Sequence, residues 1–227
     1  MNVEFSASMM CARYGNLAEE VRQLEESGID IFHIDIMDGC FVDNFGMGYQ
    51  DMQFIRSATK KQVEMHLMIK EPLRYLPILL ENHPDIIYIH PEADQDPAST
   101  LAKIKEAGVI AGIAINPGTS IAMIEELLNV VDRILILGVN PGHAGRKYMP
   151  YVGKKADKLL ALREEYGYEV YWDGAADFDR LEEFIPKGVK GFVLGTALLF
   201  GHKESYAEKM KMIREKIEMF GRGMKNE

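Results

Sequence analysis

Four side chains of metal-binding types stand at or near the ends of apolar segments: His33, Asp35, His66 and Asp173. His33 and Asp35 are two residues apart in an expected strand, so their side chains point to the same side of it. Two imidazoles and two carboxylates suit Zn²⁺ best, and also Mn²⁺, Fe²⁺ or Co²⁺. Taken singly, the histidines would be hydrogen-bonded core residues and the aspartates would cap helices. Their joint placement favours one divalent metal ion at a shared site.

Three glycine-bearing turns follow later apolar segments and could bind a phosphate group. They contain Gly142, His143, Ala144 and Gly145, then Gly174, then Gly195 and Thr196. Backbone N–H groups in such turns bind phosphate, and glycine lets the ligand approach closely. No lysine lies in these turns. Amides would therefore bind the phosphate, and Arg146 would either assist them or lie exposed in its loop.

Eight short apolar segments, alternating with amphipathic ones, must position these side chains. The expected strands are residues 3–9, 29–36, 62–68, 85–90, 109–115, 133–139, 169–173 and 191–195. Most are rich in β-branched or aromatic residues, as buried parallel strands are. The expected helices are residues 16–27, 50–57, 72–82, 98–107, 120–130, 149–166, 178–186 and 205–220.

This alternation predicts a parallel sheet, because a right-handed helical crossover joins neighbouring parallel strands. Eight units over residues 1–227, without a linker or a break in composition, predict one domain with the (β/α)8 TIM-barrel fold. An open doubly wound sheet usually has a glycine-rich first turn, whereas the first turn here contains only Gly15. The active site of a (β/α)8 barrel lies at the carboxyl ends of its strands, where the candidate residues stand.

Composition excludes several classes of function. The chain has 227 residues and a formal net charge of −9 at pH 7, which counts against nucleic-acid binding. No apolar run reaches the roughly 18 residues of a membrane span, and the first residues lack the pattern of a signal peptide. The only cysteines are Cys11 and Cys40. We therefore expect a cytoplasmic protein without nucleic-acid or membrane partners.

Several segments, in matching order over almost the whole chain, resemble the ribulose-phosphate 3-epimerase family. They are residues 32–39 (FHIDIMDG), 41–42 (FV), 44 (N), 66–68 (HLM), 139–142 (VNPG), 173–174 (DG) and 193–196 (VLGT). The resemblance implies a (β/α)8 barrel that binds one divalent metal ion through His33, Asp35, His66 and Asp173. It also implies a homo-oligomer, with Ser8 near the substrate and the phosphate in the three turns, Ala175 included.

The activity that this resemblance implies is epimerisation at C3 of a phosphorylated ketose. Inverting a carbon beside a ketone removes its proton and returns one to the opposite face, so two acid–base groups are needed. Asp35 and Asp173 would be these groups, and the metal would stabilise the enediolate as a Lewis acid. Met37 and Met68 match family methionines that border the enediolate, and His66 would also contact the substrate.

Other positions depart from the family pattern, mainly around the sugar and the phosphate. The usual Gly-Phe-Gly-Gly turn reads GHAG at residues 142–145, and Arg146 follows in place of glutamine. Ala175 replaces a second glycine, Asp43 a proline and Leu137 a methionine. None of these changes affects the four metal positions, so the chemistry is better supported than the substrate.

Two substrates stay open. D-ribulose 5-phosphate, converted to D-xylulose 5-phosphate, is narrowly favoured over D-allulose 6-phosphate, converted to D-fructose 6-phosphate. Residues 8–11 (SMMC) and 90–92 (HPE) resemble the allulose-6-phosphate 3-epimerase branch. A barrel metallohydrolase would usually begin with His-x-His on its first strand, which is absent here. A non-catalytic sugar-phosphate-binding protein is the remaining alternative, and the two carboxylates favour an enzyme over it.

Overall fold

Eight parallel strands close into a barrel in the order β1-β2-β3-β4-β5-β6-β7-β8. This computed structural model describes residues 3–223, with side chains up to residue 219, so the expected domain limits 1 and 227 lie outside the described residues. The strands are β1 (Glu4–Ser8), β2 (Ile31–Met37), β3 (Gln62–Met68), β4 (Ile86–Ile89), β5 (Ile110–Ile115), β6 (Arg133–Leu137), β7 (Glu169–Asp173) and β8 (Gly191–Leu194). The predicted fold is confirmed.

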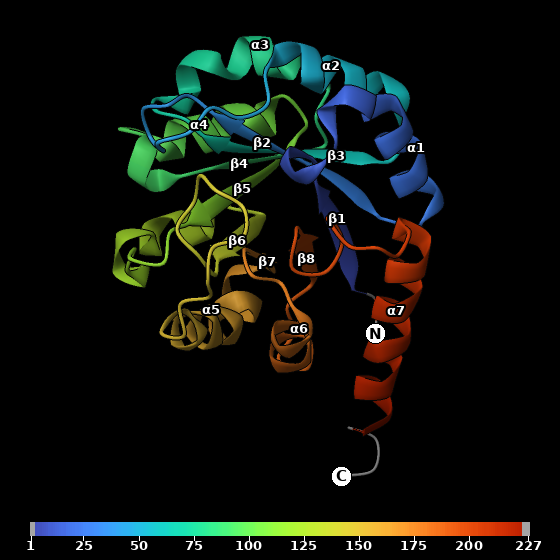
Figure 1. Cartoon of the computed structure of the whole chain (residues 1–227). Coiled ribbons are helices and arrows are strands. Elements are labelled where there is room, and N and C mark those ends of the chain that lie inside the picture. Colours follow the sequence, from blue (N-terminus) through green and yellow to red (C-terminus); the bar gives the residue numbers. More distant parts are fainter. Residues whose placement is uncertain (1–2, 224–227) are drawn as a thin grey trace.

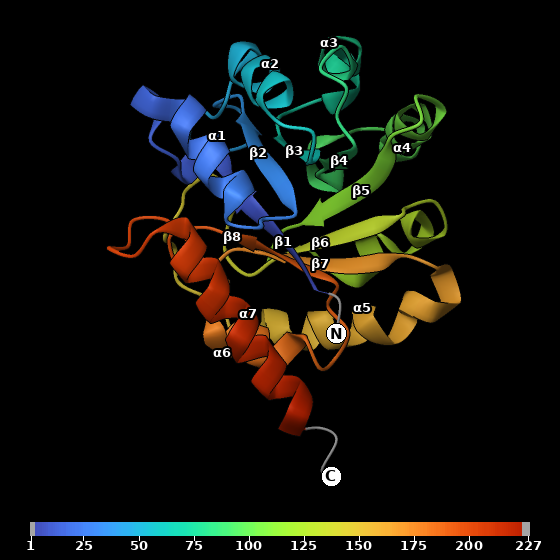
Figure 2. The ribbon, with the colours of Figure 1, turned by 90° about the vertical axis from the view of Figure 1, so that its right-hand side faces the viewer.

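Helices surround the strands as an outer ring (Figure 1, turned by 90° in Figure 2). They are α1 (Leu17–Glu26), α2 (Tyr49–Ala58), α3 (Leu76–Leu80), α4 (Pro97–Glu106), α5 (Val152–Tyr166), α6 (Phe178–Phe184) and α7 (Tyr206–Gly223). The last helix, α7, packs against both α1 and α6. Over residues 3–223, no helix is long and apolar enough to cross a membrane.

The strands are buried on both faces, which explains their nearly continuous apolar runs. In β2 all seven residues are buried. Phe32, Ile34 and Ile36 belong to the core between strands and helices. Because side chains alternate along a strand, His33 and Asp35 face the interior of the barrel.

The segment predicted as a helix over residues 120–130 is instead two short 3-10 helices, η5 (Ile121–Met123) and η6 (Glu125–Asn129). Its apolar residues Ile121, Ile124, Leu127 and Val130 recur every three positions. This spacing matches the three residues per turn of a 3-10 helix. The prediction of an α-helix was wrong here because it did not take this three-residue period into account.

The helix predicted over residues 72–82 is also shorter than expected. The structure has a 3-10 helix, η3 (Pro72–Tyr75), followed by the five-residue α3. Pro77 lies in the first turn of α3, where its missing N–H is tolerated. In the interior of a longer helix the same proline would have removed a hydrogen bond, so the helix begins just before it.

Candidate active site

The four candidate metal-binding side chains converge inside the carboxyl end of the barrel. His33 and Asp35 come from β2, His66 from β3 and Asp173 from the end of β7. Asp35 and His66 are register partners in the β2–β3 pair. Each of the four residues offers one ligand atom, and these four atoms lie within 4.8 Å of one another.

The separations between these atoms fit the coordination of a small divalent ion. His33 Nε2 lies 3.3 Å from Asp35 Oδ1 and 3.4 Å from His66 Nδ1. His66 Nδ1 lies 3.3 Å from Asp35 Oδ1 and 3.6 Å from Asp173 Oδ2. Nitrogen and oxygen ligands placed tetrahedrally around Zn²⁺ are about 3.3–3.6 Å apart, given metal–ligand distances of about 2.0–2.2 Å. The donor set therefore suits such an ion in both chemistry and spacing.

The two aspartates occupy different electrostatic environments. Burial raises the pKa of Asp35, but the facing His33 and His66 outweigh burial and lower it below the usual value. Burial raises the pKa of Asp173, and the charge of Asp35 raises it further against the opposing effect of the histidines. Environments that push two pKa values apart are typical of an acid–base pair.

Two residues beside the candidate metal ligands stabilise their charged forms: Glu64 stabilises the imidazolium of His33, and Ser8 stabilises the carboxylate of Asp35. Glu64 Oε1 lies 2.7 Å from His33 Nδ1. Burial opposes the charged imidazolium of His33, but Asp35 and Glu64 outweigh burial and raise the pKa of His33 well above its usual value. Ser8 Oγ donates a hydrogen bond of 2.8 Å to Asp35 Oδ2, which stabilises the carboxylate form of Asp35.

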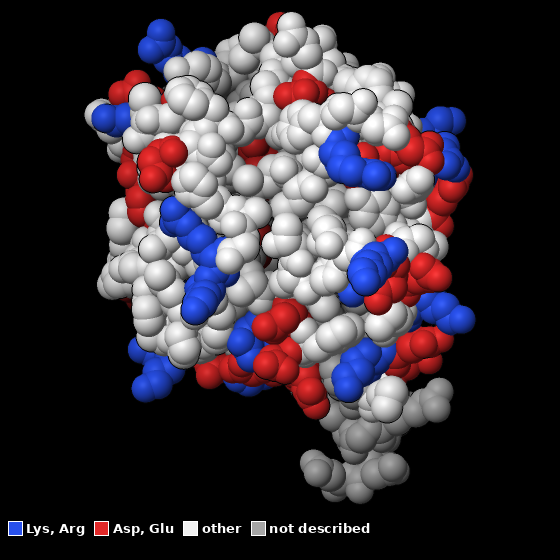
Figure 3. All heavy atoms as spheres, viewed as in Figure 1, with Lys and Arg blue, Asp and Glu red and all other residues white. Residues whose placement is uncertain are grey.

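A cavity of about 280 Å³ lies beside the cluster. In Figure 3 the middle of the visible face is hollowed and mostly uncharged, while charged side chains gather toward its periphery. All predicted site residues except the fully buried His33 line the cavity: Ser8, Asp35, Met37, His66, Met68, Gly142, His143, Ala144, Gly145, Asp173, Gly174, Ala175, Gly195 and Thr196. Leu137 and Arg146 line it as well.

The turn after β7 has a backbone conformation that glycine suits. Gly174 has φ +85°, and a Cβ there would lie 2.6 Å from Val139 Cγ2. Ala175, which replaces the second glycine of the family, has φ 49°. It keeps the left-handed conformation although this is costly for a residue with a Cβ.

The loops after β2 and β6 meet beside the cavity. Asn44 Nδ2 donates to the Gly142 carbonyl oxygen at 2.7 Å, and His143 Nε2 lies 3.0 Å from Asp43 Oδ1. Arg146 Nη1 donates to the Pro141 carbonyl oxygen at 3.2 Å, and its Nη2 lies 3.9 Å from Asp43. Three positions that depart from the family pattern thus contact one another.

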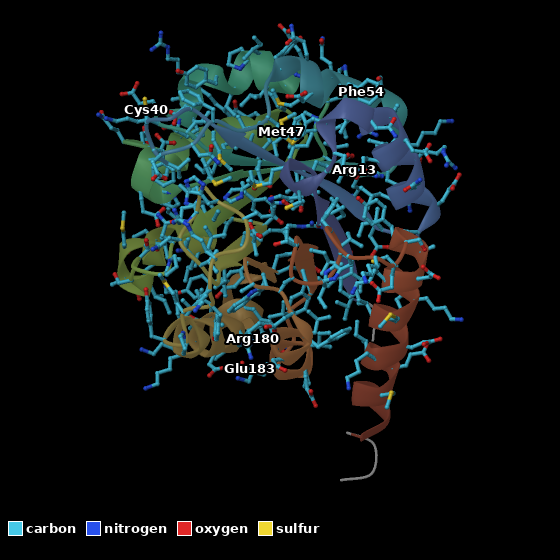
Figure 4. All side chains as sticks on the ribbon, viewed as in Figure 1. Arg13, Cys40, Met47, Phe54, Arg180 and Glu183 are labelled. Atoms are coloured by element: carbon cyan, nitrogen blue, oxygen red, sulfur yellow. The ribbon has the colours of Figure 1, made fainter. Side chains whose placement is uncertain are left out.

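Sequence reasoning assigned no role to Glu64, although it precedes His66 by two residues and so faces the same side of β3. It likewise assigned none to His90 and Glu92, although His90 directly follows β4 and is fully buried. Cys40 is exposed on the loop after β2, toward the periphery of the molecule (Figure 4).

The fold and the donor cluster define a class: a (β/α)8-barrel enzyme with paired carboxylates at the carboxyl ends of its strands. The model of the ribulose-phosphate 3 epimerase family matches residues 4–199. The chain belongs to this family and is therefore an enzyme of the isomerase class.

Individual relatives support this membership of the family. A ribulose-phosphate 3-epimerase of Synechocystis sp. is 34% identical over 217 residues, covering 94% of each chain. One from Bacillus subtilis is 33% identical over 199 residues, 86% of this chain and 92% of that protein. The crystal structure of 3-keto-L-gulonate-6-phosphate decarboxylase from Vibrio cholerae has a TM-score of 0.73 at 13% identity, covering 97% of this chain and 99% of that one. This last likeness shows the fold alone.

Proposed function

We propose that the chain is a metal-dependent ketose-phosphate 3-epimerase that converts D-ribulose 5-phosphate to D-xylulose 5-phosphate. The observation that carries this proposal is the meeting of Asp35, Asp173 and two histidines beside a cavity lined by glycine-bearing turns. Membership of the family and the names of the relatives support it.

Asp35 and Asp173 would act as the two acid–base groups. They reach the cavity from β2 and β7, so one carboxylate can remove the C3 proton while the other returns a proton to the opposite face. The order depends on the hand of the substrate, and the two residues exchange roles in the reverse reaction. Met37, Met68 and Leu137 give the cavity an apolar wall that would exclude water from the reacting carbon.

His33, Asp35, His66 and Asp173 would together hold one divalent metal ion. We propose Zn²⁺, with Mn²⁺, Fe²⁺ or Co²⁺ as alternatives, because the donors are two nitrogens and two oxygens. When bound, the ion would supply Lewis-acid stabilisation of negative charge on the substrate. Metal analysis of the purified protein, with Asp173→Asn as a variant of reduced affinity, tests this assignment.

The phosphate would bind the three turns that line the cavity. Its contacts would be backbone N–H groups of residues 142–145, 174–175 and 195–196, together with the Thr196 hydroxyl. Arg146 would add long-range attraction, since its guanidinium already donates to the carbonyl oxygens of Asn140 and Pro141. We therefore expect Arg146→Gln to raise KM with little change in kcat.

The D-allulose 6-phosphate 3-epimerase reaction is the second candidate. Ala175 lines the cavity at the position where the family pattern has a second glycine. The absence of this glycine resembles the allulose-6-phosphate 3-epimerase branch. Residues 8–11 and 90–92 favour the same branch.

A parallel assay of both sugar phosphates on metal-replete protein tests the function and the substrate. We expect turnover of at least one, with a higher kcat/KM for D-ribulose 5-phosphate. Asp35→Asn and Asp173→Asn should each lower kcat by about 10²–10⁴-fold while circular dichroism stays unchanged. Tight binding of either compound without turnover would identify a sugar-phosphate-binding protein instead.

We also propose that residues 1–227 form one domain of a cytoplasmic homo-oligomer without nucleic-acid or membrane partners. The two cysteines form no disulfide, as in a reducing compartment. The homo-oligomer is what the resemblance to the ribulose-phosphate 3-epimerase family implies. Light scattering after size-exclusion chromatography tests the oligomer.

A further inference from the structure

The second ring nitrogen of His66 leads away from the candidate metal centre to a buried pair. His66 Nε2 lies 2.9 Å from His90 Nε2, and the two ring planes are inclined by 29°. His90 is fully buried, and its other nitrogen, Nδ1, lies 3.5 Å from Glu92 Oε2. The side chains of His66, His90 and Glu92 therefore form one line from the cluster to the end of β4.

A hydrogen bond between two imidazole nitrogens needs a proton on one and a lone pair on the other. Two arrangements are available. Either His66 donates through Nε2 and keeps a lone pair on Nδ1, or His90 donates and the His66 proton moves to Nδ1. Only the first leaves His66 Nδ1 able to bind a metal ion.

The position of Glu92 favours the first arrangement, in which His66 donates through Nε2. Its Oε1 accepts hydrogen bonds from the Asn116 backbone N–H, at 3.0 Å, and from the Thr119 hydroxyl. Its Oε2 and His90 Nδ1 are buried and have no hydrogen-bond partner among the described residues. A proton on His90 Nδ1 is attracted to the facing carboxylate, whereas a lone pair there would be repelled by it.

We propose that His90 and Glu92 are positioning residues that fix the tautomer of His66, so that Nδ1 presents a lone pair to the metal ion. The inference rests on the proposed metal centre. Glu92 holds the proton of His90 on Nδ1, which makes His90 Nε2 the acceptor for the Nε2–H of His66. The other ligand histidine, His33, contacts its carboxylate Glu64 directly, so the two ligands are oriented by different means.

Glu92→Gln gives a sharp test because it reverses the polarity of this line. The Asn116 N–H and the Thr119 hydroxyl hold the new amide oxygen in the place of Oε1, so the NH₂ group faces His90 Nδ1. His90 then accepts at Nδ1 and carries its proton on Nε2, and His66 is driven to the tautomer that cannot bind the metal. Glu125→Gln, an exposed carboxylate-to-amide change on η6, is the matched control.

Zinc affinity of the metal-free protein, measured by competition with a chromophoric chelator, is the first readout. We expect Glu92→Gln to weaken Zn²⁺ binding by about 10–100-fold and Glu125→Gln to leave it unchanged. If wild type binds Zn²⁺ tightly and Glu92→Gln binds it within twofold, the positioning role is wrong. If wild type binds no Zn²⁺, the proposed metal centre itself fails.

Long-range ¹H–¹⁵N correlation spectra of the zinc-loaded wild-type protein give a second readout that needs no variant. We expect a proton on His90 Nδ1, a lone pair on His90 Nε2, and a scalar coupling across the hydrogen bond from His66 Nε2. A proton on His90 Nε2 would overturn the proposal even if zinc binds.

Discussion

At the scale of single residues, some placements in the site follow from the alternation of side chains along one strand, and others do not. His33 and Asp35 could be assigned to one side of β2 from their spacing alone. The contact between His33 and Glu64, by contrast, depends on the register of β2 against β3. The line from His66 to Glu92 depends likewise on how β4 and its following turn meet β3. Such contacts depend on how neighbouring strands pair, which the spacing of residues along one strand does not give.

Ser8→Ala tests how the environment of Asp35 is tuned. Removing the hydrogen bond from Ser8 Oγ destabilises the carboxylate, so the pKa of Asp35 rises and the acidic limb of kcat/KM moves to higher pH. A hydrogen bond to a charged group contributes about 1.5–3 kcal/mol, so we expect a loss of about 10–100-fold on the acidic side. Ser6→Ala, on the same face of β1, is the control, and an unshifted acidic limb for Ser8→Ala would contradict this role.

At the scale of elements, the strands were predictable because burial on both faces leaves continuous apolar runs, and all eight were expected within two residues of their bounds. The connecting helices were less predictable. Two of them differ from the predicted α-helices. Pro77 limits the helix before β4 to five residues, and the three-residue period of residues 121–130 gives 3-10 helices before β6. The contact between Asn44 and Gly142 joins residues 98 positions apart, so only the folded chain reveals it.

Gly174→Ala tests the turn after β7 as a phosphate-binding element. The new Cβ would need a left-handed backbone, at a cost of about 1–2 kcal/mol, and would displace Val139. We expect a lower melting temperature and a KM raised by at least about tenfold through misplaced amides. Gly118→Ala, where a Cβ meets nothing within 4 Å, should change neither. Equal KM values for both variants would exclude this turn from the binding site.

At the scale of the whole molecule, the two ends of the barrel have different tasks. The candidate site occupies the carboxyl end. At the amino end Arg133 lies over the Tyr171 ring at 4.4 Å, with Glu4 and Glu169 at 3.8 and 3.9 Å.

The net charge of −9 describes the surface as a whole, because the cavity is lined mainly by uncharged groups and backbone amides.

Arg133→Leu should separate stability from activity. The substitution removes a largely buried charge from its partners, so we expect the free energy of unfolding to fall by about 1–3 kcal/mol, with kcat and KM within twofold of wild type. Lys190→Leu removes a more exposed partner of Glu169 and should cost less than about 1 kcal/mol. A large rise in KM for Arg133→Leu would show that the two ends are coupled.

The most direct test of the central claim is the fate of the C3 proton. D-ribulose 5-phosphate is incubated in heavy water with the metal-replete protein, and the D-xylulose 5-phosphate formed is examined by NMR and mass spectrometry. Removal by one aspartate and return by the other predicts one deuterium at C3 of the product. Product without deuterium at C3 would contradict the two-aspartate epimerisation.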